Sequence, residues 1–208
     1  MDETLLAERL QERIAGVCLI AGALLMAAST FLEFAGGLLF GAGLVGMLAY
    51  LCFIPATLGI ARSLRPRAPR LSVWGGLLAT VGCVGGVTFE TALLHEWAER
   101  TAGTPEMAML AISAVVKGRL FPVLVLFGIQ FSISLLVLGV GLWRIGVVPR
   151  WVPVLLGCGA LLFPFGHIGN IQLVTHLANL LLIVPMVWLG LRALTNAPPQ
   201  GVAIPAVA

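Results

Sequence analysis

Charged residues are scarce in this chain. They make up 10% of its 208 residues, whereas 60% are hydrophobic and the mean hydropathy is +1.06. A soluble domain carries about 25% charged and about 45–50% apolar residues, and a soluble fold of this length could not bury so much apolar surface. The scarcity of charge therefore excludes an ordinary soluble domain, and a lipid bilayer is the expected environment and partner.

Motifs for catalysis and redox chemistry are also missing. The sequence has no GxSxG serine, no pair of aspartates for a metal–pyrophosphate site and no lysine inside an apolar stretch. Its four cysteines lie in apolar stretches without a CxxC pair, and we interpret them as small buried hydrophobes: Cys18, Cys52, Cys83 and Cys158. We therefore favour a protein that is not an enzyme. The net charge of +3 does not indicate a nucleic-acid partner, because membrane topology accounts for the arginines.

Long apolar stretches occupy most of the sequence, and each crossing of a bilayer needs about 20 apolar residues. The predicted spans are residues 14–32, 38–61, 72–96, 120–143, 151–168 and 171–191. We predict an all-α polytopic membrane protein with one six-span domain at residues 14–194. A cytoplasmic amphipathic segment at 1–13 precedes it, and a flexible tail at 195–208 follows. Thr104-Pro105-Glu106 is typical of a helix start and predicts a short outer helix near 105–117.

The basic residues are distributed unevenly around these spans. Four arginines share one short loop, at Arg62, Arg65, Arg67 and Arg70. The positive-inside rule assigns that loop to the cytoplasm, and six spans then make both termini cytoplasmic. Nine of the 12 basic residues fall inside under this topology, and Arg100, Lys117 and Arg119 fall outside. Four tryptophans lie at the inner ends of spans and Trp97 at an outer end, as an aromatic belt requires.

One acidic residue lies within a predicted span. Glu90 continues a face of small residues with helical spacing, formed by Ala79, Cys83 and Gly86. Small residues mark a packed helix face, so Glu90 should point into the bundle. A charged side chain in the bilayer costs about 2.5–3.5 kcal/mol on insertion scales, and such residues usually line a cavity or find a partner.

The last predicted span carries a polar stripe. Gln172, His176 and Asn179 share one helical face, and leucines such as Leu173 and Leu177 form the opposite face. Glu90 and His176 fall at similar depth, so we predict a contact between them. The two residues would form the centre of an outward-facing polar pocket. Further candidate residues of this pocket are Asn179, Gln172, His167 and Gln130. Pro164 and Gly166 are expected to unwind the outer end of the preceding span.

Three interpretations of these residues remain open. The pocket could bind or transport a small or lipidic ligand. Alternatively, the polar groups could form a structural clamp between helices of a regulatory or structural membrane subunit, with a membrane-protein partner or as a homo-oligomer. His95, His167 and His176 could also hold a metal ion or a b-type haem, although the sequence has no HxxxH or HxxE spacing. The cofactor therefore stays unassigned.

The C-terminal third carries a recognisable topological pattern. Its segments are Leu138-Gly139-Val140-Gly141-Leu142-Trp143-Arg144, Pro149-Arg150-Trp151 and Val154-Leu155-Leu156-Gly157. This pattern resembles that of uncharacterised bacterial multi-pass membrane proteins with about six helices, in which a span ends in an aromatic–Arg pair and turns through Pro-Arg-Trp. The resemblance implies a bacterial inner-membrane protein. It assigns no functional residues.

Overall fold

The computed structural model describes residues 3–36, 38–103, 105, 107–108, 110–111, 121–169 and 171–195. Its long helices are α1 (Glu3–Gly36), α2 (Leu39–Leu64), α3 (Pro69–Thr101), α5 (Phe121–Ile145), α6 (Trp151–Ile168) and α7 (Gln172–Thr195). Each of these six is long and apolar enough to cross a membrane. No strand occurs among the described residues. The prediction of an all-α chain with six helices long and apolar enough to cross a membrane is therefore confirmed for this part of the chain.

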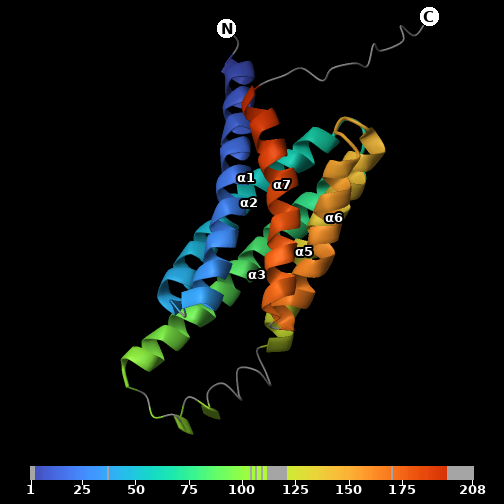
Figure 1. Ribbon diagram of the computed structural model, residues 1–208. Coiled ribbons are helices and arrows are strands. Elements are labelled where there is room, and N and C mark those ends of the chain that lie inside the picture. Colours follow the sequence, from blue (N-terminus) through green and yellow to red (C-terminus); the bar gives the residue numbers. More distant parts are fainter. Residues whose placement is uncertain are drawn as a thin grey trace, which may run out of the picture.

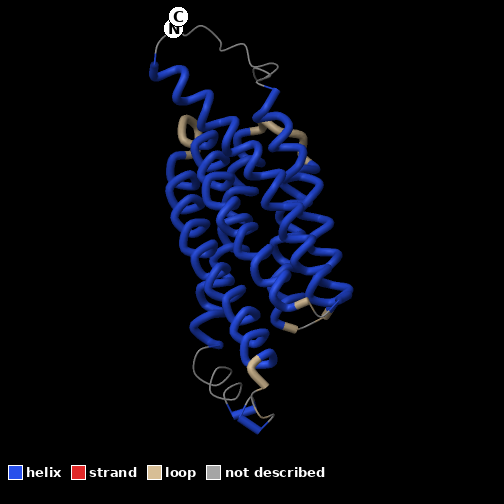
Figure 2. The backbone as a smooth tube through the Cα atoms, turned by 90° about the vertical axis from the view of Figure 1, so that its left-hand side faces the viewer, coloured by secondary structure: helices blue, strands red, loops and turns tan. Residues whose placement is uncertain are grey.

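The helices form one bundle (Figure 1), and the contacts between them follow a closed ring in chain order. Each helix packs against its neighbours along the chain, and α7 closes the ring by packing against α1. Figure 2 shows the helices running roughly alongside one another. Aromatic rings fill the centre, where the Phe131 ring lies 5.1 Å from the Phe53 ring and 6.1 Å from the Phe163 ring. The core therefore joins α2, α5 and α6 across the ring.

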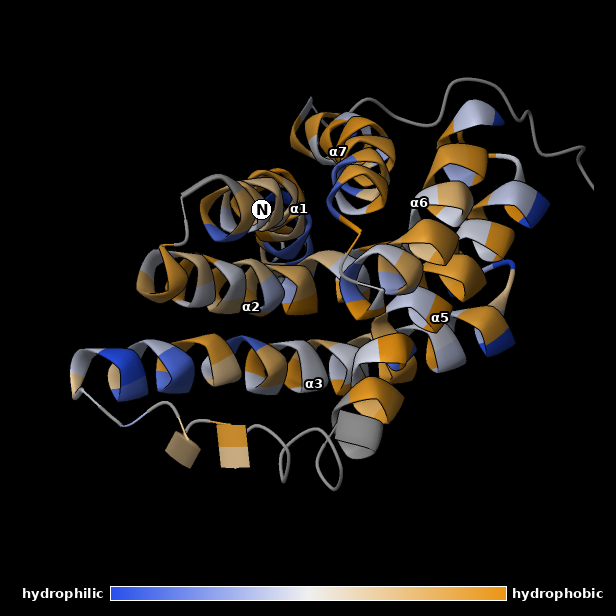
Figure 3. Cartoon of the chain, turned by 60° about the horizontal axis from the view of Figure 1, so that its bottom comes forward, coloured by the Kyte–Doolittle hydropathy of each residue, from blue (hydrophilic) through white to orange (hydrophobic). Residues whose placement is uncertain are grey.

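Two helices extend beyond the bundle at opposite ends. Helix α1 has 34 residues and α3 has 33, which gives each a length of about 50 Å against a hydrocarbon core of about 30 Å. The start of α1 and the end of α7 lie at one end of the bundle, and the last turns of α3 project from the other. Those last turns are hydrophilic (Figure 3). Each long helix thus combines an apolar crossing with a polar extension.

The predicted N-terminal segment and the first predicted span form one continuous helix in the structure. Helix α1 runs without a break from Glu3, because residues 3–14 contain neither glycine nor proline to interrupt it. The predicted outer helix near 105–117 lies mostly outside the described residues, and it stays a prediction. Lys117, Arg119 and the tail from residue 196 also lie outside them.

The expected unwinding at Pro164 and Gly166 is wrong. Helix α6 contains both residues and continues to Ile168. Gly166 instead permits a close approach to α7, because a Cβ atom there would lie 2.7 Å from the backbone nitrogen of Thr175. The chain turns only afterwards, where the Gly169 N–H donates to the Phe165 carbonyl at 3.0 Å. The glycine therefore serves helix packing at this position.

Candidate functional site

Glu90 occupies the buried face of α3. Ala79 and Cys83 are fully buried, Gly86 is buried, and Glu90 is only 6% exposed. The prediction that this face of small residues turns Glu90 into the bundle is confirmed. The opposite side of α3 carries exposed residues such as Val84, which suits a helix with one side towards its neighbours and one towards lipid.

Glycines of α2 make room for the Glu90 side chain. A Cβ atom at Gly46 would overlap the carboxyl group of Glu90, and one at Gly43 would lie 3.0 Å from the Glu90 carbonyl oxygen. One turn away along α3, the pattern reverses, because the Tyr50 ring of α2 lies against Gly86. The two helices therefore interlock, with a large residue of each facing a glycine of the other.

The carboxyl group of Glu90 is incompletely satisfied. Its Oε2 atom is buried and has no hydrogen-bond partner among the described residues. Removing a charged or polar oxygen from water without a partner is unfavourable by several kcal/mol in an apolar medium. Such an atom inside a predicted membrane span is a chemically notable feature of this fold.

Further carboxyl groups surround the same end of the bundle. Glu33, near the end of α1, interacts electrostatically with both Glu90 and Glu96. Within the described part of the chain, the one ion pair is between Glu96 and Arg100, four residues apart on α3. Glu33 and Glu90 therefore have no ion-pair partner in that part of the chain.

The predicted contact between Glu90 and His176 does not form. The His176 ring instead lies edge-on to Phe34 of α1, with 6.0 Å between ring centroids. The reason is the order of the ring of helices: α7 packs against α1 and α6, whereas α3 packs against α2 and α5. Both residues face inward, but they belong to different helix–helix seams.

The polar residues on one face of α7 become more buried along the helix. Gln172 is exposed, His176 is half-buried, and Asn179 is 4% exposed. The Asn179 amide donates to the Thr30 hydroxyl of α1 at 2.8 Å, while Asn179 Oδ1 has no partner among the described residues. Asn179 also borders a small central space of about 10 Å³, which is near the minimum for one water molecule. The stripe thus joins α7 to α1.

The remaining candidates do not converge on one site. Gln130 is half-buried on α5, and His95 is exposed on α3. His167 bonds within its own helix, where Nδ1 lies 3.0 Å from the Phe163 carbonyl oxygen. No group of three His, Cys, Asp or Glu residues that could hold a metal ion occurs among the described residues. The three histidines lie on α3, α6 and α7, and the structure does not bring them together as ligands.

Short polar residues of α1 are the partners that sequence reasoning missed. Ser29 donates to the Ala42 carbonyl of α2 at 2.8 Å, and Thr30 both accepts from Asn179 and donates to the Met26 carbonyl at 3.1 Å. Tyr50, next to Gly86, was also missed. The only sequence signal for Ser29 and Thr30 was their position, because two adjacent hydroxyl residues in an apolar span need acceptors.

Comparison with known proteins adds no assignment. No protein-family model, curated protein or solved structure matches this chain. The six apolar helices are those of a multi-pass membrane protein. The function must be inferred from the chemistry of the buried polar groups.

Proposed function

We propose that this chain is a multi-pass protein of a bacterial inner membrane that binds or transports a small or lipidic ligand at Glu90. The observation that carries this proposal is the buried carboxyl group with an unpartnered oxygen. Ionisable residues in membrane spans commonly belong to ligand, ion or proton pathways. The C-terminal topological pattern supports the bacterial membrane, and the arginine-rich loop supports cytoplasmic termini.

The ligand should carry a hydrogen-bond donor or a positive charge. Glu90 offers an acceptor, and Glu33 adds a second carboxyl group nearby without a basic partner in the described chain. In their ionised forms, the two carboxyl groups would repel an anionic ligand. The proposed site therefore lies in the seam between α1, α2 and α3, and His176 and Asn179 stand in the separate seam between α1 and α7.

Access to this site would be from the outer end of the seam between α2 and α3. The ring of Phe40 of α2 lies against the ring of Trp97 of α3 there, tilted by 48° and with 4.8 Å between the ring centroids. Trp97 lies two helical turns beyond Glu90, about 10 Å along the axis. Separation of these two rings would expose the path to the carboxyl group, and the ring pair would act as the outer closure.

A second candidate function is supported by the close packing. The carboxyl group lies directly against Gly46, and Asn179 forms an interhelical hydrogen bond. These contacts suit a structural or regulatory membrane subunit in which polar side chains fix helix register. The two candidates differ in whether removing the carboxylate affects a bound molecule or only the stability of the bundle.

Native mass spectrometry and thermal unfolding together test the choice. The experiment compares the wild-type protein, purified with native lipid, with Glu90→Gln and with the control Glu99→Gln, which changes another acidic residue of α3. The ligand proposal expects a co-purified non-protein mass that Glu90→Gln loses while its unfolding temperature stays near the wild-type value. No bound mass in the wild type, with a lower unfolding temperature for Glu90→Gln alone, would establish the structural role instead.

A further inference from the structure

A positively charged hollow lies at the opposite end of the bundle from the α3 extension. It occupies about 460 Å³ between the start of α3 and the end of α5. Its lining residues are Arg67, Ala68, Pro69, Arg70, Leu71, Arg144 and Ile145. Three arginines from two separate segments of the chain therefore border one open space.

The three arginines of the hollow differ from Arg62, Arg150 and Arg192 at the same end, whose side chains each have a partner. Arg62 donates to Gln11 at 2.8 Å, Arg150 lies over the Trp143 ring, and Arg192 donates to the Val147 carbonyl at 2.5 Å. Arg67, Arg70 and Arg144 form no ion pair or side-chain hydrogen bond with the described residues. Their charge is available to an anion from outside the chain.

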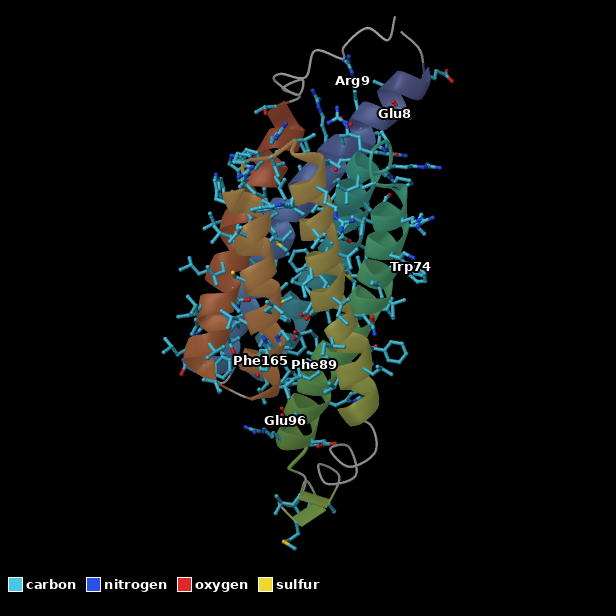
Figure 4. The ribbon with its side chains drawn as sticks, turned by 90° about the vertical axis from the view of Figure 1, so that its right-hand side faces the viewer. Glu8, Arg9, Trp74, Phe89, Glu96 and Phe165 are labelled. Carbon is cyan, nitrogen blue, oxygen red and sulfur yellow. The ribbon has the colours of Figure 1, made fainter. Side chains whose placement is uncertain are left out.

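Tryptophans place this hollow at the depth of lipid headgroups. Trp74 is one helical turn beyond Arg70, about 6 Å along α3, and Trp143 directly precedes Arg144. Tryptophan side chains favour the interface between headgroups and hydrocarbon. Figure 4 shows Trp74 projecting away from the bundle, where it is 60% exposed. The arginines therefore lie just outside the aromatic belt.

An apolar surface continues from the hollow into the membrane. Val73, Trp74 and Leu77 are all largely exposed along the same region of α3, and Leu71 lines the hollow itself. A ligand with an anionic head and apolar chains would contact the arginines and this surface simultaneously. A soluble phosphate would use the arginines alone.

We propose that Arg67, Arg70 and Arg144 bind the phosphate group of an anionic phospholipid whose acyl chains lie along α3. Guanidinium groups are suited to phosphate because their planar N–H donors match its oxygen atoms. Basic hollows between membrane helices are known binding places for anionic headgroups. This site is independent of the one proposed at Glu90, because it lies at the other end of α3.

Native mass spectrometry of the full chain in detergent tests the proposal with defined lipids. The protein is titrated with palmitoyl-oleoyl phosphatidylglycerol, with the matching phosphatidylcholine and with inorganic phosphate. We expect one phosphatidylglycerol to bind more tightly than phosphatidylcholine. Arg70→Gln and Arg144→Gln should each weaken its binding about fivefold, the factor expected for one basic residue near an anionic membrane surface.

Arg65→Gln is the matched control. Arg65 is an exposed arginine of the same loop that does not line the hollow, so its loss should leave the affinity within about twofold of the wild type. Single substitutions preserve the inside excess of basic residues, and thermal unfolding in phosphatidylcholine verifies that each variant folds. Equal affinity for the two lipids, or an equal loss in Arg65→Gln, would overturn the proposal. Displacement of the lipid by millimolar inorganic phosphate would assign the hollow to a soluble anion and would also overturn it.

Discussion

Replacing Gly46 with alanine tests whether α2 and α3 interlock at Glu90. The added methyl group would overlap the Glu90 carboxyl group. The α3 backbone has little room to withdraw, because on its other side a Cβ atom at Gly85 would lie 2.6 Å from the Cβ atom of Phe127 of α5. Overpacking of this kind costs about 1–3 kcal/mol, whereas a glycine-to-alanine change within a helix gains up to about 1 kcal/mol.

Gly41→Ala provides the matched control on the same helix. A Cβ atom at Gly41 would meet only the Leu32 side chain, at an ordinary contact distance of 3.5 Å. Helix propensity contributes similarly to both variants, so the difference in unfolding free energy between them isolates the overlap. We expect Gly46→Ala to be about 1–3 kcal/mol less stable than Gly41→Ala, measured by denaturant unfolding in detergent micelles.

A double substitution makes the test specific for the carboxyl group. In a Glu90→Ala background, the space beside Gly46 is empty, so the added methyl group should be neutral or stabilising. An unchanged loss of stability for Gly46→Ala in that background would refute the contact with Glu90. Equal stability of Gly46→Ala and Gly41→Ala in the wild-type background would refute the close packing itself.

Two further predictions concern the rest of the bundle. Asn179→Ala should lower the unfolding free energy by about 1 kcal/mol, because it removes the interhelical hydrogen bond to Thr30. Gln172→Ala, at the exposed start of the same helix, should change the unfolding free energy by less than about 0.5 kcal/mol. Equal losses of stability in the two variants would contradict a stabilising role for the Asn179–Thr30 hydrogen bond. The topology can be tested by labelling single cysteines with a membrane-impermeant maleimide. The cysteines are introduced as Pro66→Cys or Ala102→Cys into a variant without the native cysteines. We expect Ala102→Cys to react from outside intact cells and Pro66→Cys only after the membrane is opened, and the reverse pattern would invert the proposed orientation.

The helices were predictable because the bilayer imposes a simple pattern on the sequence. Each crossing needs a long apolar stretch, and each of the six predicted stretches corresponds to one of the six long helices, with bounds that differ by a few residues. The inward direction of Glu90 was also predictable, because the spacing of Ala79, Cys83 and Gly86 defines one face of α3. The lipid-facing side of α7 followed in the same way from its leucines, such as Leu173, which is 80% exposed.

The partners of the polar residues could not be predicted because helical periodicity says nothing about which helices are neighbours. Glu90 and His176 both face inward, but α3 and α7 occupy separate places in the ring. The position opposite Glu90 could not be predicted for the same reason. Helix α2 contains several glycines, and the sequence does not indicate that Gly46 is the one that accommodates the carboxyl group. The effect of Pro164 was misjudged for a related reason: the packing of Gly166 against Thr175 holds α6 to α7 beyond the proline.

The Glu90 side chain has two properties that matter for its role, its size and its acidity. Replacing it with alanine would remove both at once. Filling the space opposite Gly46 requires only bulk, and a neutral residue of similar size would supply it without the cost of a charged group in the membrane. The carboxyl group adds an acceptor, and its Oε2 atom has no partner in the described chain. Packing therefore explains why the side chain is large and well placed, but it does not explain why it is acidic. A ligand or a transferred proton would use the acidic group, and this is why Glu90→Gln, which keeps the bulk, is the decisive substitution.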